Sequence, residues 1–156
     1  MDRGKLEKRA TQPDWPGVKA GDEPPPRVLG PLNRTDFVRY QGASGDMNPI
    51  HHDEPFAKAS GYPAPLAVGM FTAGVMTSWA TDWLGPENVR RTRIRWIHPC
   101  FPGMVLTIRG EVVATRSTPG AHEIAPLEVD LLITATNADS APVVHVWMTF
   151  HLPLEP

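Results

Sequence analysis

One octapeptide gathers the side chains best suited to acid–base chemistry. Segment 44–51 reads Ser-Gly-Asp-Met-Asn-Pro-Ile-His, so a carboxylate (Asp46), an amide (Asn48) and an imidazole (His51) lie within six positions. A histidine titrates near neutral pH, and beside a carboxylate it is suited to moving protons to and from a water molecule. The 44–51 segment is therefore a candidate catalytic segment.

The backbone of this segment favours a rigid, irregular loop. Gly45 allows backbone angles closed to other residues, while Pro49 fixes its own φ and keeps Asn48 out of the helical region. Such a loop can aim Asp46 and His51 at one point, whereas in a strand their odd spacing would place them on opposite faces. The alternative is a turn in which Asp46 and Asn48 only bond to neighbouring backbone amides.

A long uncharged run follows the loop. The run Leu66–Leu84 carries no charge before Asp82, and its apolar side chains fall on every face of a helix. A helix of this kind is buried. Pro65 suits its first turn and Gly85 its end, so we expect one buried helix whose start lies beside the 44–51 segment. Interspersed Gly, Ser and Thr residues argue against a membrane span.

Shorter elements are expected before the long helix. Thr35 is followed by an acid and apolar residues, which suits the N-cap of a short helix ending near Gly42. A second short helix is expected over Pro55–Ser60, and Arg27–Gly30 suits a short edge strand. The first short helix would lead the chain directly into the 44–51 segment.

The second half of the chain changes to a period of two. Apolar and polar residues alternate in four segments, as in strands with one buried face and one solvent-exposed face. The four expected strands are Val89–Ile97, Met104–Ala114, Leu127–Ala135 and Val144–Leu152. An antiparallel sheet of this kind buries its apolar face if it wraps around the apolar helix. The pattern predicts an α+β fold of the hot-dog type.

Length and composition limit the class of protein. The chain has 156 residues, 41% of them apolar, and a net charge of −2, which fits one globular domain and does not indicate a nucleic-acid or membrane-surface binder. The single Cys100 fits a reducing compartment, so we expect a cytoplasmic protein. Residues 1–13 are polar and without periodicity, so we expect them to be disordered and the domain to span residues 14–156.

Three pieces of the sequence together resemble one known family. They are Tyr40–Asp53 (Tyr-Gln-Gly-Ala-Ser-Gly-Asp-Met-Asn-Pro-Ile-His-His-Asp), Val68–Met70 and Pro99–Gly103. The combination resembles the MaoC-like (R)-specific enoyl-thioester hydratases and dehydratases, over roughly Pro16 to Leu152. The Asp-x-Asn-Pro-x-His core is the specific part of this resemblance, because the strand matches alone are weak.

The resemblance implies a reaction and a role for each site residue. Asp46 and His51 would activate one water molecule, which adds to a trans-2-enoyl thioester to give a (3R)-3-hydroxyacyl thioester, or catalyse the reverse. Asn48 would fix the loop, and the backbone N–H of Gly69 would receive the thioester oxygen. Thr77 falls where the family often has a hydroxyl near the catalytic carboxylate. The substrate would be a thioester of coenzyme A or of an acyl carrier protein, with no further cofactor and no metal.

This chain departs from the family at one position. Many members have His where this chain has Val68, directly before the supposed oxyanion donor Gly69. The donor is a backbone group at a helix N-terminus, where unpaired N–H groups and the helix dipole favour negative charge. Activity therefore need not depend on the missing imidazole, although the pocket mouth becomes less polar.

Two other kinds of polar cluster are candidate binding sites. The run Arg90–Arg95 suits a solvated strand face; alternatively it would meet coenzyme A phosphates or an acidic carrier-protein surface, with Arg95 as the candidate. A metal site is disfavoured, because neither His51–Asp53 nor the pair His98 and Cys100 matches a closed zinc spacing. Cys100 has no evident base beside it, which favours packing over a nucleophilic role.

Two other functions fit the same fold. A hot-dog thioesterase also binds an acyl thioester but usually has an acid on or near the central helix, where this chain has none before Asp82. A non-catalytic subunit would pair with another hot-dog chain, against which the intact Asp46, Asn48 and His51 argue. A small sheet leaves an open edge, so we expect a homodimer, with a heterodimer of two hot-dog subunits as the alternative.

Overall fold

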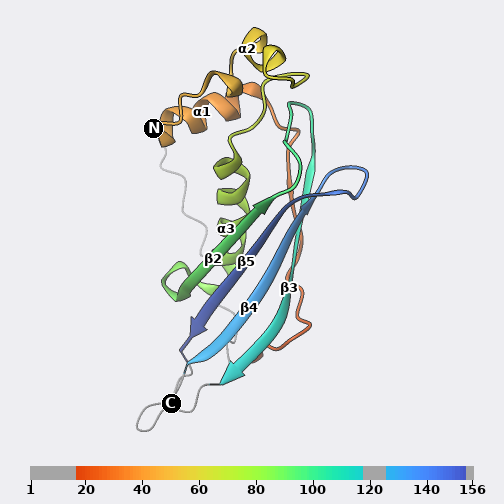
Figure 1. The fold of residues 1–156 in the computed structure, drawn as a ribbon. Coiled ribbons are helices and arrows are strands. Elements are labelled where there is room, and N and C mark those ends of the chain that lie inside the picture. Colours follow the sequence, from red (N-terminus) through yellow and green to blue (C-terminus); the bar gives the residue numbers. More distant parts are fainter. Residues whose placement is uncertain (1–16, 118–125, 154–156) are drawn as a thin grey trace, which may run out of the picture.

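The computed structural model describes residues 17–117 and 126–153 (Figure 1). The predicted disorder of residues 1–13 lies outside the described residues. The elements in chain order are β1 (Arg27–Leu29), α1 (Arg34–Ser44), the 3₁₀ turn η2 (Pro49–His51), α2 (Glu54–Ala59), α3 (Gly69–Leu84), the 3₁₀ turn η3 (Pro86–Asn88), β2 (Val89–Trp96), β3 (Leu106–Ser117), β4 (Leu127–Thr136) and β5 (Pro142–Leu152). Helices thus precede the four long strands, as the change of period predicts.

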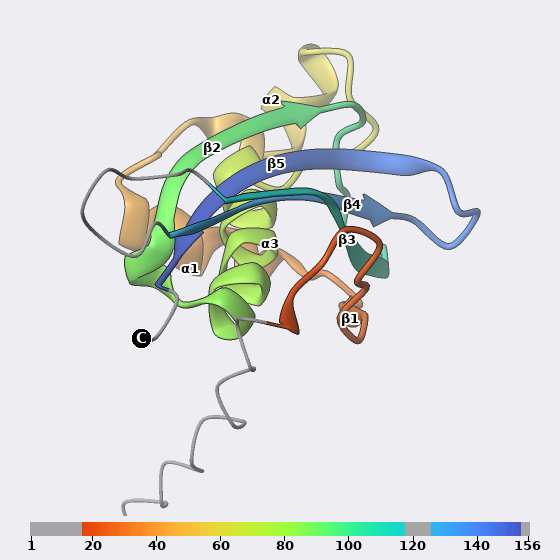
Figure 2. The same cartoon turned by 90° about the horizontal axis from the view of Figure 1, so that it is seen from below.

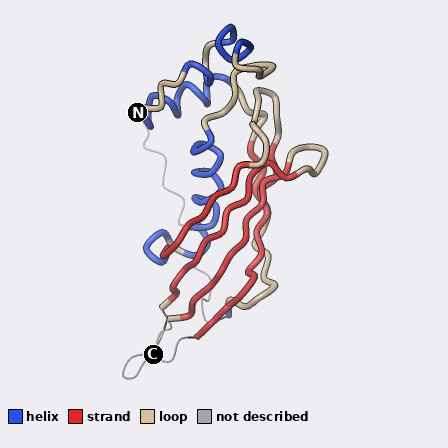
Figure 3. Tube along the Cα trace, viewed as in Figure 1, coloured by secondary structure: helices blue, strands red, loops and turns tan. Residues whose placement is uncertain are grey.

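The strands form one antiparallel sheet in the order β1-β3-β4-β5-β2. Figure 2 shows this sheet curving over α3, and Figure 3 shows the helices gathered on one side of it. The short helices α1 and α2 lie beyond the end of the sheet where β2 finishes (Figure 1). The predicted α+β hot-dog architecture is confirmed.

The alternation predicted for the strands determines which face of the sheet is buried. The buried residues on the α3 side include Leu106, Ile108, Val112, Val129, Leu131, Ile133, Val144, Val146, Met148 and Phe150. Strand register joins them into one layer, since Val146 lies between Ile133 of β4 and Ile94 of β2. The apolar layer gives α3 its packing surface, and the polar residues between these positions face outward.

The central helix begins at Gly69, three residues later than the sequence predicts. The chain before it is extended, because Val68 has φ −59° and ψ 127°. The backbone N–H of Ala67 donates to the Cys100 carbonyl at 2.8 Å, a contact that holds this segment against the sheet end instead of in a helical turn. Pro65 is therefore not part of the helix, while Gly85 ends it as predicted.

One face of α3 is open, so the expectation of a helix buried all round is wrong for the single chain. Met76 and Ala80 are fully buried toward the sheet, whereas Met70 is 50% exposed. Gly74 and Ser78 are also exposed and continue the same face at helical spacing. Within the described residues, no helix has the length and apolar character needed to cross a membrane.

Helix α1 is capped two residues earlier than predicted. Asn33, not Thr35, is the N-cap, and its side chain accepts a hydrogen bond from the backbone N–H of Asp36 at 3.0 Å. The Asp36 carboxylate accepts in return from the N–H of Asn33 at 3.2 Å, which completes a capping box. In α2 the N-cap is Asp53, whose carboxylate accepts from the N–H of Phe56.

A large aromatic side chain of α3 packs directly on the sheet backbone. Trp79 is 6% exposed, and its indole N–H donates to the Pro25 carbonyl at 3.1 Å. The ring lies over Gly110 of β3, where an added Cβ would lie 2.6 Å from two ring carbons. Close approach of helix and sheet at this point therefore requires a residue without a side chain.

We expect Gly110→Ala to lower the free energy of unfolding by about 1–3 kcal/mol, because the buried indole has to move. Chemical denaturation measures this change. Gly42→Ala in α1 is the matched control, since no atom lies within 4 Å of its added Cβ and Ala is the better helix former by about 1 kcal/mol. Equal stability of the two variants would contradict the proposed packing.

Candidate active site

The loop between α1 and η2 is exposed, yet its backbone is fixed by short polar contacts. Gly45 ends α1 with a φ of 77°, in the left-handed region that favours glycine. One carboxylate oxygen of Asp46 accepts from the N–H of Asn48 at 3.3 Å, and Asn48 Oδ1 accepts from the N–H of Ile50 at 3.1 Å. The chain is irregular here, as predicted, and both polar residues make the turn contacts that formed the alternative interpretation.

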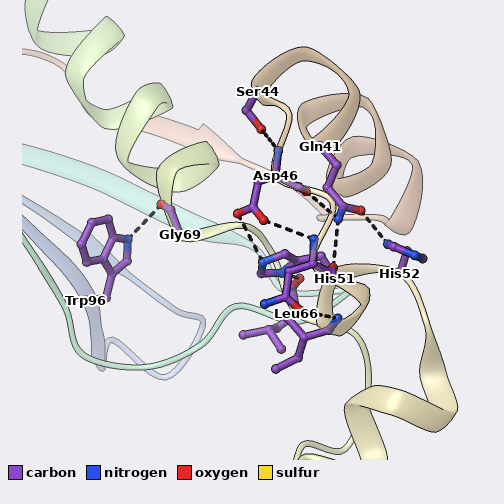
Figure 4. Close-up of polar contacts among 10 residues, drawn as sticks. Gln41, Ser44, Asp46, His51, His52, Leu66, Gly69 and Trp96 are labelled. Atoms are coloured by element: carbon purple, nitrogen blue, oxygen red, sulfur yellow. Dashed lines mark hydrogen bonds and ion pairs between the residues drawn. The ribbon is translucent and has the colours of Figure 1, made fainter.

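The second oxygen of the Asp46 carboxylate faces His51. Oδ2 of Asp46 lies 3.8 Å from Nε2 of His51, and Figure 4 shows the two side chains pointing toward one another. The His51 side chain is 10% exposed and the Asp46 side chain 45%. The structure thus brings together the carboxylate and imidazole singled out in the sequence, with one of them buried and the other open to solvent.

A backbone contact determines which nitrogen of His51 carries the proton. Nδ1 of His51 lies 2.8 Å from the carbonyl oxygen of Leu66, which can only accept. Nδ1 must therefore bear hydrogen and donate. In the neutral ring, Nε2 then has its lone pair free and directed at Asp46, so His51 is oriented to act as a base at that atom.

The same contact ties the loop to the start of α3. Leu66 is held twice, because its N–H also donates to the Ile50 carbonyl at 3.3 Å. The next residue, Ala67, donates to the Cys100 carbonyl at the sheet end. Gly69 is three positions after Leu66, so their Cα atoms lie at most about 11 Å apart. The base and the helix start are therefore held at short range by the backbone.

Gly69 is the first residue of α3, and among the described residues its backbone N–H makes no backbone hydrogen bond. As the first residue of the helix, its N–H has no carbonyl one turn earlier in the helix, and Val68 provides no side-chain cap. Its carbonyl accepts from the indole N–H of Trp96 at 2.9 Å and from the Thr72 hydroxyl at 2.9 Å. A Cβ on Gly69 would come within 3.0 Å of the Trp96 ring, so glycine also allows this close packing.

These groups line a common cavity of about 290 Å³. Its walls are His51, Tyr62, Leu66, Ala67, Gly69, Thr72, Trp96, Ile97, His98, Pro99 and Cys100. The imidazole of His51 and the start of α3 therefore face the same space, which is mainly apolar. A molecule in this cavity would therefore be within reach of both the imidazole and the first residue of the helix.

Of the six predicted site residues, only His51 and Gly69 belong to this lining. Asp46 and Asn48 lie on the exposed loop beside it, and Thr77 and Arg95 lie elsewhere. Thr77 is two turns into α3 and donates its hydroxyl to the Gly74 carbonyl at 3.0 Å. Arg95 is exposed on β2 opposite His145, on the outer side of the sheet, while its neighbour Trp96 turns toward α3. Their assigned roles stay predictions, since neither side chain reaches the cavity that His51 lines.

Three contributors were not predicted from the sequence. The carbonyl of Leu66 orients His51, Trp96 forms a cavity wall, and Gln41 is 2% exposed beneath the loop. A backbone carbonyl has no sequence signature. Gln41 did have one, because a polar residue four positions after the apolar Phe37 lies on the buried face of α1.

Cys100 is buried, as expected for a packing residue. It is 4% exposed, and burial raises the pKa of its thiol from 9.0 to about 11. Among the residues that the structure describes, no group of three or more His, Cys, Asp or Glu side chains is placed to hold a metal ion.

Comparison with known proteins gives a consistent result. A family model described as MaoC like domain matches residues 17–136. The 3-hydroxyacyl-thioester dehydratase Y of Mycobacterium tuberculosis is 31% identical over 116 residues, which are 72% of this chain and 37% of that protein. A solved MaoC-like dehydratase has a TM-score of 0.76 at 29% identity, covering 91% of this chain and 43% of its own. The (R)-hydratase from A. caviae involved in PHA biosynthesis has a TM-score of 0.73 at 20% identity, covering 88% and 98%.

The curated relatives are longer than the region that this chain shares with them. The chain matches 14%, 11% and 37% of the length of three curated relatives. The likeness to the (R)-hydratase, at 20% identity, concerns the fold.

Cys100 offers a test of the cavity wall in the folded protein. With a pKa of about 11, roughly 0.1% of this thiol is ionised at pH 8, against about 10% at its ordinary value of 9.0. We expect a disulfide reagent to label folded protein far more slowly than protein unfolded in guanidinium, and the rate to rise about tenfold per pH unit from pH 8 to 10. Labelling of the folded protein at the unfolded rate would show that the thiol is not buried.

Proposed function

The chain belongs to the MaoC-like domain family, and on that premise we propose that it hydrates trans-2-enoyl thioesters to (3R)-3-hydroxyacyl thioesters or catalyses the reverse dehydration. The observation that carries the proposal is the facing pair of Asp46 Oδ2 and His51 Nε2, 3.8 Å apart. His51 and the N-terminus of α3 share a cavity. Hydration of an enoyl thioester needs groups of these two kinds: a base that activates water, and hydrogen-bond donors that stabilise the thioester carbonyl oxygen.

The facing pair suits a single water molecule. When the imidazole is neutral and the carboxylate is ionised, both Nε2 of His51 and Oδ2 of Asp46 present lone pairs, and 3.8 Å is too long for a direct hydrogen bond. A water molecule that donates one hydrogen bond to each atom would satisfy both. In the proposed reaction its oxygen bonds to C3, and the proton it loses is taken up by the pair and delivered to C2. General acid–base catalysis of this kind contributes roughly 10²–10⁴-fold.

The helix N-terminus suits the charge that develops at the other end of the substrate. As the C–O bond forms, the π electrons of the double bond move toward the thioester oxygen and give an enolate. The N–H of Gly69 and the positive end of the α3 dipole would stabilise this oxygen. Val68 stands where many members have His. Because its side chain is apolar and 3% exposed, this position contributes no polar group here.

The thioesterase alternative is less well supported by the geometry. The acid of α3, Asp82, lies near the far end of the helix and forms an ion pair with Arg27 at 2.7 Å. It is not part of the cavity lining. A thioesterase that recruits an acid from the central helix would therefore lack it in this chain.

Incubation with a crotonyl thioester and with a saturated acyl thioester separates these functions. Loss of enoyl absorbance without release of thiol is expected for a hydratase, and chiral analysis of the product tests the (3R) assignment. Release of thiol from both substrates would instead identify a thioesterase. Absence of turnover by the purified chain would favour the non-catalytic subunit.

We expect Asp46→Asn and His51→Ala each to lower turnover by about two decades or more, because each removes one acceptor of the reacting water. Steady-state kinetics measure the loss, and circular dichroism checks that both variants fold. Near-normal turnover in either folded variant would reject the mechanism. Asn48 belongs to the same proposal as a positioning residue, through its contact with the N–H of Ile50.

A second hot-dog subunit is proposed as the partner. Within the described part of the chain, β2 pairs only with β5 and forms one edge of the sheet. Met47, Met70 and Trp96 are 60%, 50% and 46% exposed, and they lie on the loop, the helix start and the strand that border the site. A homodimer that covers this surface would enclose the cavity further, and a heterodimer would use the same surface.

Light scattering on the purified chain tests this association. We expect a mass twice that of one chain, and Met70→Asp to shift the equilibrium toward monomer by placing a charge in the contact. Val28→Asp is the matched control, since Val28 is 65% exposed on β1 at the opposite edge of the sheet. A monomeric wild-type chain would exclude the homodimer, and equal behaviour of the two variants would exclude this surface.

A further inference from the structure

Gln41 is a buried amide directly beneath the 44–51 segment. It lies in the last turn of α1 and is 2% exposed, whereas residues 42–49 that follow it are all exposed. Its backbone carbonyl accepts from the N–H of Gly45 at 2.8 Å and so closes the helix end. The loop that carries Asp46 therefore has little core packing of its own, and Figure 4 shows the Gln41 side chain directed at this loop.

The side chain of Gln41 holds two carbonyls of the loop. Its Nε2 donates to the carbonyl oxygens of Asp46 at 2.8 Å and of Asn48 at 3.1 Å. Both partners only accept, so the NH₂ group must face them and Oε1 must face the other way. There Oε1 lies 3.1 Å from Nδ1 of His52, which must then carry hydrogen and donate. Gln41 is thus hydrogen-bonded at both ends of its amide group.

These contacts fix residues on both sides of the Asp46 side chain. A rotation of the peptide groups that carry the Asp46 or Asn48 carbonyl would break one of the two hydrogen bonds from Gln41 Nε2. Asp46 reaches His51 from an exposed loop, so its 3.8 Å separation from Nε2 depends on the backbone conformation and not on packing of its own side chain. The two hydrogen bonds that Gln41 Nε2 donates to the loop carbonyls restrain this backbone conformation.

We propose that Gln41 is a positioning residue for the reaction, which sets the separation of Asp46 and His51 by clamping the loop carbonyls, with His52 holding the amide in orientation. The proposal rests on the proposed function for its effect on rate. Gln41 lines no part of the cavity, so its loss acts on catalysis and not on substrate binding. A displacement of about 1 Å in a reacting group can lower the rate by roughly 100-fold.

The test variant is Gln41→Met, which keeps the length and burial of the side chain but has no N–H to donate. We expect kcat to fall by roughly 10- to 100-fold while KM changes by less than about threefold. Amide hydrogen exchange of residues 45–52 should accelerate by at least about tenfold, with the exchange of α3 and the sheet unchanged. The hydrogen-exchange measurement does not depend on turnover. It can therefore reject the positioning role of Gln41 even if the proposed hydratase function is wrong, and the two hypotheses are tested separately.

Val129→Ala is the matched control for a loss of stability alone. Val129 is fully buried in β4, in register with Phe150 and Val89 at the end of the sheet away from Trp96. At a comparable loss of thermal stability it should leave kcat and the exchange of residues 45–52 near the wild-type values. The proposal is overturned if Gln41→Met keeps wild-type kcat, if its loss matches that of Val129→Ala, or if loop exchange stays slow.

Discussion

The hydrogen bond from Nδ1 of His51 to the Leu66 carbonyl is the interaction on which the site depends. It is 2.8 Å long, and its acceptor belongs to the backbone, so the position of the acceptor does not depend on a side-chain rotamer. It fixes the tautomer of the imidazole and presents Nε2 to Asp46. Because Leu66 also lies three residues before Gly69, the same bond sets the distance between the base and the helix donors. Removing the Leu66 carbonyl from this position would disconnect the two halves of the site.

Local patterns predicted most of the fold. The alternation in residues 127–135 and 144–152 identified the inner face of β4 and β5 correctly, because one face of an antiparallel sheet is buried and the other is not. The start of α3 was predicted too early, since Ala67 bonds to Cys100, a residue distant in sequence. The open face of α3 was missed for a related reason. Apolar composition shows that a surface needs covering, but not whether its own chain or a partner covers it.

The sequence singled out the side chains of the candidate site but not the groups that hold them in place. Asp46, Asn48 and His51 have chemistry that can be recognised by residue type and spacing. The groups that orient them are of another kind: a carbonyl at Leu66 and a buried amide at Gln41, whose roles follow from tertiary contacts. A turn interpretation and a catalytic interpretation of Asp46 also proved compatible, because its two carboxylate oxygens have different partners, the N–H of Asn48 and the ring of His51.

The reacting groups lie close together in the chain, whereas part of the cavity wall does not. Asp46, His51 and Gly69 fall within 24 consecutive residues, and Trp96, Ile97 and Cys100 come from a later part of the sequence. For the proposed hydratase, substitutions in this later wall would change the space available to an acyl chain, while the contacts among Asp46, Asn48, Ile50 and His51 lie in the earlier part of the chain. Under the proposed function, substrate range and reaction type would then be encoded in different parts of the chain, so that one could diverge while the other is retained.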